Sequence, residues 1–193
     1  RVAVKAKTIN NRYDKLSYLY NEFEHHQGAE VGVWKGIMAS QMLQRVPSIQ
    51  KYYLVDPWVH LANWNKPFNT NNEEFTDVFN LAMNATKPWE SKRVVLRGLS
   101  KEMAKEVEIA SLDFVYIDGD HTAHGTKLDI MSWWPRLRIG GILYGDDFLD
   151  GLQHGKDYAP TAVKSVIVKF AAKFGVLLYE LGGNQYMMVK TTK

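Results

Sequence analysis

The stretch Gly28-Ala-Glu-Val-Gly-Val-Trp-Lys-Gly36 decides the fold, because it has the pattern of a strand that turns sharply into a helix. Within it, Ala29 to Val33 predicts a short buried strand, and Ile37 to Arg45 predicts the helix that follows. Tyr52 to Val55 predicts a second strand. A strand, a helix and a strand in this order are typical of a parallel sheet covered by helices.

The same alternation continues to the end of the chain. Asp14, taken as an N-cap, opens a first helix over residues 14 to 26. Further helices are predicted at Phe75–Ala82, Lys101–Val107, residues 124–134 and Ala162–Phe170, and further strands at Arg93–Leu96, Phe114–Ile117, Gly141–Tyr144, Val176–Leu181 and Gln185–Lys190. Gly182, Gly183 and Asn184 form a hairpin signal, so the last strand should run antiparallel to its neighbour. We therefore predict an α/β, Rossmann-like fold: a mostly parallel seven-stranded sheet with an antiparallel last strand and helices on both faces.

The composition is that of one folded domain. With 193 residues, 46% hydrophobic and 23% charged, the chain can bury a single sizeable core. We expect residues 1–27 to form a helical segment before a catalytic core over residues 28–193, and the start at Arg1 is compatible with excision from a longer protein. The lack of cysteine excludes disulfides, zinc–thiolate sites and cysteine nucleophiles. No stretch approaches the ~20 apolar residues of a membrane span, and the basic residues are dispersed, so we expect no membrane or nucleic-acid partner and a cytoplasmic location.

The glycine turn favours a cofactor without phosphates. Gly32 and Gly36 flank Trp34, at the place where a dinucleotide site usually has a third glycine for close approach of the pyrophosphate. A bulky residue there disfavours NAD but accommodates S-adenosylmethionine, whose amino acid part can lie against the Gly32 backbone. The alternative is that Gly32 serves only a tight connection between strand and helix.

Asp56 strengthens this interpretation, because a carboxylate at the end of the second strand can accept hydrogen bonds from ribose hydroxyls. Its alternative role is that of a loop acid or cap. Gly98 and Ser100 follow the next strand and could reach an adenine edge, although Ser100 could equally be an N-cap for the helix at Lys101. The candidate cofactor-binding residues are Glu30, Gly32, Trp34, Ser40, Asp56, Trp58, Gly98, Ser100, Asp118 and His121.

Acidic residues follow two further strands, in Ile117-Asp-Gly-Asp-His121 and in Gly145-Asp-Asp147. Because the carboxyl ends of parallel strands share one edge of the sheet, Asp118, Asp146 and Asp147 should converge there. Carboxylates held close together repel one another unless a proton or a hard cation intervenes, which predicts a site for Mg²⁺ or Mn²⁺. Asp120 and Asp147 could instead be loop acids that cap turn amides.

His121 lies just beyond this strand, where it could accept a proton from an acceptor hydroxyl. We list His121 and Asp118 as the candidate catalytic residues. A solvent-facing loop histidine or a ring stacked on adenine are the alternatives for His121, and His124 is a weaker candidate for the base.

These motifs resemble those of class I S-adenosylmethionine-dependent methyltransferases. The resemblance extends from about Gly28 to Lys190 and rests on Glu30-x-Gly32, Asp56-Pro-Trp, Ile117-Asp-Gly-Asp-His and Pro135-x-Leu-x-x-Gly-Gly before Gly145-Asp-Asp. It is strongest for the small metal-dependent enzymes that methylate hydroxyl groups of sugars, such as the deoxysugars of macrolides and aminocoumarins, which are related to catechol-type O-methyltransferases.

The resemblance implies that Asp118, Asp146 and Asp147 hold the divalent cation. Catechol-type enzymes have a lysine base at the position of His121, and in sugar enzymes a metal-bound aspartate has also been proposed as the base, so both remain open. We expect a small-molecule or glycan acceptor, such as a deoxysugar, between the loop carrying Trp58, His60 and Trp64 and the segment Phe148 to Tyr158.

Three other function classes compete with a sugar O-methyltransferase. A metal-dependent enzyme that methylates phenols or catechols would use the same cluster. A nicotinamide oxidoreductase is disfavoured by Trp34, and a nucleic-acid base methyltransferase would carry Asn or Asp before Pro-Pro and an aromatic residue where Asp118-Gly-Asp-His121 stands. A non-catalytic cofactor-binding domain would leave the three acids and the histidine without a purpose.

Overall fold

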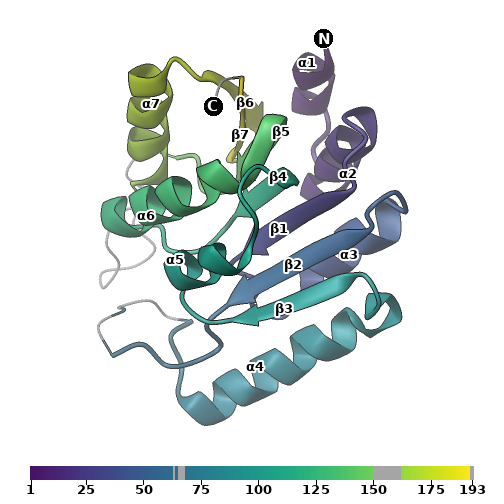
Figure 1. Ribbon diagram of the computed structural model, residues 1–193, viewed down its shortest axis with the longest axis vertical. Coiled ribbons are helices and arrows are strands. Elements are labelled where there is room, and N and C mark those ends of the chain that lie inside the picture. The colour runs from purple at the N-terminus through teal and green to yellow at the C-terminus, as the bar shows by residue number, and fades with distance from the viewer. Residues whose placement is uncertain (63, 65–67, 150–161, 192–193) are drawn as a thin grey trace.

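The computed structural model describes residues 1–62, 64, 68–149 and 162–191, and its centre is one seven-stranded sheet (Figure 1). The strands lie in the order β3-β2-β1-β4-β5-β7-β6. Neighbouring strands from β3 to β5 pair parallel, whereas β7 pairs antiparallel with both β5 and β6. The strands are β1 (Gln27–Val31), β2 (Lys51–Asp56), β3 (Arg93–Arg97), β4 (Leu112–Ile117), β5 (Leu137–Gly145), β6 (Leu177–Gly182) and β7 (Gln185–Val189). The predicted sheet, including its antiparallel last strand, is confirmed.

Helices cover both faces of the sheet, as predicted (Figure 1). On one side lie α2 (Arg12–Glu22), α3 (Ile37–Arg45) and α4 (Asn72–Ala85), and on the other α5 (Ser100–Met103), α6 (Ala123–Trp133) and α7 (Val163–Phe174). The short α1 (Val2–Lys7) packs against α2 and β6. Three 3₁₀ turns complete the described elements: η1 (Lys87–Trp89), η2 (Ala104–Glu106) and η3 (Trp134–Arg136).

The two faces bury different kinds of side chain. Strand β4 is buried along its whole length, as expected of a central parallel strand with helices above and below it. Its residues alternate between the two cores, with Tyr116 facing α2 and Val115 facing α6 and α7. The α2 side contains four fully buried tyrosines, Tyr20, Tyr52, Tyr116 and Tyr144.

Some predicted boundaries are wrong. The opening helix begins at Arg12 because Asn11, not Asp14, is its N-cap: the Asn11 side chain accepts hydrogen bonds from the backbone amides of Tyr13 and Asp14 at 2.9 and 3.2 Å. Asp14 instead pairs with Arg45 of α3. The helix predicted over Lys101–Val107 is the short α5 followed by a 3₁₀ turn.

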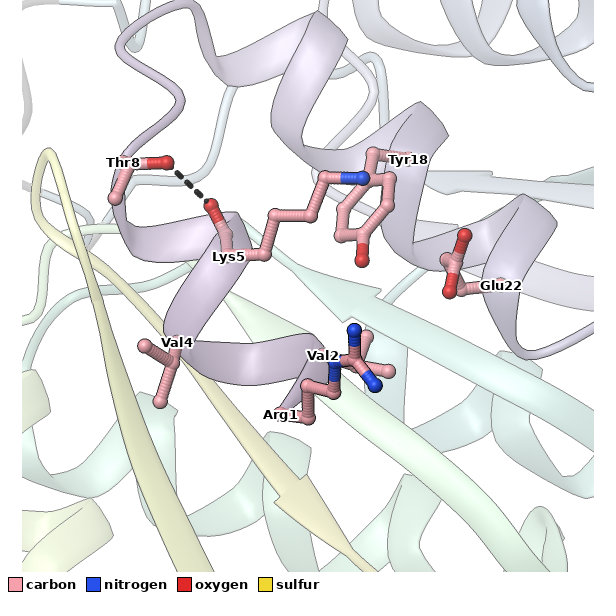
Figure 2. Close-up of a pocket in the computed structure, with 7 residues that line it drawn as sticks. All are labelled: Arg1, Val2, Val4, Lys5, Thr8, Tyr18 and Glu22. Atoms are coloured by element: carbon pink, nitrogen blue, oxygen red, sulfur yellow. Dashed lines mark hydrogen bonds between the residues drawn. The ribbon is translucent and has the colours of Figure 1, made fainter.

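Two further features of the structure concern membrane-spanning helices and a surface hollow. Among the residues that the structure describes, no helix has the length and apolar character to cross a membrane. A hollow of about 700 Å³ lies between α1 and α2, lined by Arg1, Val2, Val4, Lys5, Thr8, Tyr18 and Glu22 (Figure 2). It contains none of the predicted site residues, which lie instead around the ends of β1 to β5 and on the helices α3 and α5.

Candidate active site

The turn after β1 packs directly against the end of β4. Gly32 has a φ of +90°, and a Cβ at this position would lie 2.1 Å from the carbonyl oxygen of Asp118. The Asp118 amide in turn donates to the carbonyl of Val31 at 2.8 Å. Only glycine fits both the conformation and the space, so the tight-connection role of Gly32 is established, and the same contact places Asp118 beside the glycine turn.

Asp118, His121 and Asp147 form a cluster at the ends of β4 and β5. His121 Nδ1 lies 2.9 Å from Asp147 Oδ2, and His121 Nε2 lies 3.5 Å from Asp118 Oδ1. One potential ligand atom from each residue falls within 4.8 Å of the others. Two carboxylates and an imidazole are a suitable donor set for Mn²⁺, and the carboxylates suit Mg²⁺, so the residues fit the predicted cation.

Asp146 has a different partner. Its Oδ2 accepts a hydrogen bond from Arg12 Nη1 at 2.6 Å, and the same nitrogen lies 3.8 Å from Asp118 Oδ2. Burial, and secondly the nearby Asp118 charge, raise the pKa of Asp146 to about 6. Of the three predicted metal ligands, the structure therefore brings Asp118 and Asp147 together with His121 and pairs Asp146 with an arginine.

Asp120 and His124 lie outside this cluster. Asp120 Oδ1 accepts from the Thr122 amide at 3.0 Å, which is the capping role weighed as its alternative. His124 is exposed on the first turn of α6. The structure thus leaves His121 as the histidine that contacts the acidic cluster.

Asp56 holds the two turns next to it. Its Oδ2 accepts from the Trp34 amide at 3.0 Å and its Oδ1 from the Trp58 amide at 2.8 Å. The side chain is buried, and burial raises its pKa. The capping role is therefore present, while ribose binding stays a prediction.

Trp58 is not a surface aromatic. Its side chain is fully buried, packs edge-on against Phe79 and donates from Nε1 to the carbonyl oxygen of Trp34 at 2.8 Å. The Trp34 ring in turn meets Phe68 and Phe75 edge-on. Trp58 thus supports the glycine turn, and its predicted contact with the cofactor or acceptor stays a prediction.

The remaining candidates for the cofactor occupy varied surroundings. Glu30 is 1% exposed and accepts a hydrogen bond from the Tyr52 hydroxyl at 2.9 Å. The Ser40 hydroxyl donates to the Ile37 carbonyl of its own helix. Gly98 follows β3 and bonds to the Asp56 carbonyl. Ser100 is the first residue of α5 and accepts from Trp133 Nε1 at 2.9 Å, so it is not the N-cap weighed as its alternative.

The predicted acceptor region is described in part. His60 is fixed to the end of its loop, because its amide donates to Asn72 Oδ1 at 2.8 Å and its Nδ1 lies 2.9 Å from the Thr70 carbonyl. A hollow of about 240 Å³ beside it is lined by His60, Asn69, Thr70, Asn71 and Asn72. Of the segment from Phe148 to Tyr158, residues 150–158 lie outside the described residues.

The comparisons with known proteins agree with this architecture. Residues 29–148 match a family model described as a methyltransferase domain, which covers more than half of the chain. The chain belongs to this methyltransferase family. None of the curated protein sequences matches the chain.

Solved structures share the fold of this methyltransferase at low sequence identity. A protein described as a caffeoyl-CoA O-methyltransferase from Staphylococcus aureus is 16% identical with a TM-score of 0.68, over 94% of this chain and 85% of its own. The O-methyltransferase NovP is 14% identical with a TM-score of 0.65, over 94% and 80%. The methyltransferase PaMTH1 of Podospora anserina, solved with S-adenosylhomocysteine, is 14% identical with a TM-score of 0.65, over 99% and 88%.

The contact of Arg12 with Asp146 in this methyltransferase is not predicted by the sequence. A single arginine at the start of a helix, far from the acidic motifs in sequence, carries no pattern that points to them. Only the packing of α2 across the sheet, through buried Leu16, Leu19 and Tyr20, brings its first residue to Asp146.

Proposed function

We propose that this protein transfers a methyl group from S-adenosylmethionine to a hydroxyl oxygen of a sugar, with the assistance of a divalent cation. The observation that carries the proposal is the convergence of Asp118, His121 and Asp147 beside the Gly32 turn, in a chain of the methyltransferase family. The sulfonium of S-adenosylmethionine is an activated donor, so the protein has to position an oxygen nucleophile and remove its proton.

The cation is assigned to Asp118, Asp146 and Asp147, and His121 beside them is assigned the role of base. When bound, it would lower the pKa of the acceptor hydroxyl. The imidazole of His121 would then take the proton at Nε2, since Asp147 contacts Nδ1 at 2.9 Å and favours the tautomer that carries its hydrogen there. His121 Nε2 faces Asp118 Oδ1 at 3.5 Å, so the carboxylate would stabilise the imidazolium once Nε2 has taken the proton.

The cofactor is assigned to the turns around Gly32 and Asp56. The family match supports S-adenosylmethionine, and Trp34 between the two glycines supports a ligand without a pyrophosphate. Asp56 fixes the backbone of Trp34 and Trp58, and the lone pairs that its carboxylate oxygens do not use for these bonds would accept the ribose hydroxyls.

The sugar acceptor is supported by the polar loop beside the site. The small hollow is lined by the polar residues His60, Asn69, Asn71 and Asn72, and residues of this kind pair with the hydroxyls of a polyol. Exposed Phe68 in the same loop offers an apolar surface for the face of a pyranose ring.

The proposal is tested by calorimetric titration of S-adenosylmethionine and NAD, followed by methyl-transfer assays on panels of sugars and catechols with and without a chelator. We expect binding of S-adenosylmethionine only, methylation of sugars, and loss of turnover on chelation with cofactor binding retained. Methylation of phenols alone would replace the sugar by a catechol-type acceptor, and full turnover after exhaustive chelation would refute the cation.

The base is tested with a matched pair of histidine variants. His121→Ala should lower kcat by roughly 10²- to 10⁴-fold, the usual effect of removing a general base. His124→Ala, three positions away and exposed, serves as the control and should keep kcat. Equal rates in the two variants would exclude His121 as the base and leave a metal-bound aspartate for that role.

A further inference from the structure

The first residue of α2 places a positive charge inside the acidic cluster. Arg12 Nη1 donates to Asp146 Oδ2 at 2.6 Å and lies 3.8 Å from Asp118 Oδ2, so one nitrogen stands between two of the carboxylates assigned to the cation. The guanidinium of Arg12 therefore acts as a counter-ion to these two carboxylates.

Arg12 and a divalent ion cannot both bind the Asp146 carboxylate without strong repulsion between their charges. Mg²⁺ and Mn²⁺ bind carboxylate oxygens at about 2.1 Å, so an ion on Asp146 Oδ2 cannot lie more than about 4.7 Å from Arg12 Nη1. Two positive charges at that separation repel each other strongly at a partly buried site. Binding of the ion to Asp146 therefore requires Arg12 to leave.

The structure gives Arg12 the freedom to leave without unfolding the helix. Its side chain is 40% exposed, whereas the helix behind it is anchored by buried Leu16, Leu19 and Tyr20. The Asn11 cap fixes the backbone at the start of α2 independently of the Arg12 side chain. Rotation of this side chain into solvent would break the contact with Asp146 and leave the cap and the helix in place.

We propose that Arg12 is a built-in competitor of the divalent cation, which holds Asp146 while the site is free of metal and lowers the affinity of the site for the metal. The inference rests on the proposed function, because it needs the cation at Asp118, Asp146 and Asp147. Arg12, at the start of α2, would thus help to set the concentration of free metal that the enzyme requires.

The test is a titration of the full chain with Mn²⁺, followed by the loss of the free-ion electron paramagnetic resonance signal. Arg12→Gln should bind Mn²⁺ roughly tenfold more tightly or better, because the competing charge is gone. Arg12→Lys keeps the charge and should stay close to the wild type. The matched control is Arg45→Gln. It removes an arginine of α3 that has a similar exposure and pairs with Asp14, which lies on the same helix α2 as Arg12.

Unchanged or weaker binding in folded Arg12→Gln would overturn the competition while leaving the cation of the proposed function in place. Absence of Mn²⁺ binding in both the wild type and Arg12→Gln would overturn the competition and the proposed cation together. A second measurement needs no variant: in the wild type, Mg²⁺ should shift the guanidinium NMR signals of Arg12 as the side chain leaves Asp146. Signals unchanged at saturating Mg²⁺ would also refute the proposal.

Discussion

Burial of the Glu30 carboxyl should make the stability of this protein fall as the pH rises. The side chain lies on the α2 side of β1, 1% exposed, and accepts a hydrogen bond from the Tyr52 hydroxyl. Loss of hydration disfavours the charged form, and burial raises the pKa of Glu30 from 4.5 to about 8, although the bond from Tyr52 acts in the opposite direction.

The direction in which the free energy of unfolding changes with pH follows from which state, folded or unfolded, holds the proton of Glu30. Between pH 4.5 and 8 Glu30 is ionised in the unfolded chain and protonated in the folded one, so the folded state binds more protons. The free energy of unfolding therefore decreases with pH over this window, and the stabilisation present below pH 4.5 is lost as the pH approaches 8. From pH 5 to pH 8 the two pKa values give a loss on the order of 3 kcal/mol relative to a variant that cannot ionise.

The assay is urea unfolding of the wild type and Glu30→Gln at pH 5 and pH 8, followed by tryptophan fluorescence. The glutamine can still accept the Tyr52 hydroxyl, and Glu108→Gln removes an exposed glutamate as the control. Glu30→Gln should gain on the order of 3 kcal/mol on the wild type between the two pH values, and the control should gain almost nothing. A difference that does not change with pH would show that Glu30 is ionised in the folded protein, which would refute the burial argument.

Two further predictions concern the same core and the adjoining turn. His25 is buried among aromatic rings with Nε2 at 3.1 Å from the Tyr144 hydroxyl, and burial lowers its pKa from 6.5 to about 4. Its contribution is present above pH 6.5 and is lost as the pH falls, so the wild type should lose on the order of 2 kcal/mol relative to His25→Gln between pH 7 and 4.5 in the same unfolding assay. Gly32→Ala should lower the free energy of unfolding by about 3 kcal/mol or more, because a Cβ would overlap the Asp118 carbonyl. Gly175→Ala has a similar positive φ with nothing within 4 Å, so its thermal shift should report about 1 kcal/mol of backbone strain alone, and equal shifts in the two variants would argue against the overlap.

The sheet could be predicted from the sequence because each of its strands carries a local signal. Strand β4 contains the apolar run Phe114–Ile117, and Gly182, Gly183 and Asn184 mark the hairpin that reverses β7. The convergence of Asp118 and Asp147 also follows from topology alone, since both residues come after strands that pair in parallel. These features depend on neighbours in sequence or on strand order, and both can be inferred without side-chain positions.

The features that could not be predicted depend on packing between distant segments. Trp58 stands in a polar loop, where a tryptophan has the pattern of a ligand-facing ring, yet it is completely buried because α4 supplies Phe79 and the glycine turn supplies a carbonyl. The pairing of Asp146 with Arg12 joins residues 134 positions apart in the sequence. No local pattern encodes either contact.

The two aspartates after β5 show how far local sequence determines the chemistry at this site. Asp146 and Asp147 are adjacent in sequence, but their side chains point to different partners. Successive side chains point in different directions along an extended chain, and Asp147 also has a φ of +55°. Asp147 contacts the histidine that follows β4, whereas Asp146 contacts the arginine at the start of α2. A cation that takes both carboxylates must therefore displace Arg12, while one held by Asp118, His121 and Asp147 leaves that pair intact and withdraws His121 from the role of base. Arg12→Gln and His121→Ala together distinguish the two arrangements. With the cation on both aspartates, Arg12→Gln should bind Mn²⁺ more tightly, and His121→Ala should lose rate while it keeps the metal. With the cation on Asp118, His121 and Asp147, Arg12→Gln should keep the wild-type affinity, and His121→Ala should lose affinity for the metal together with rate.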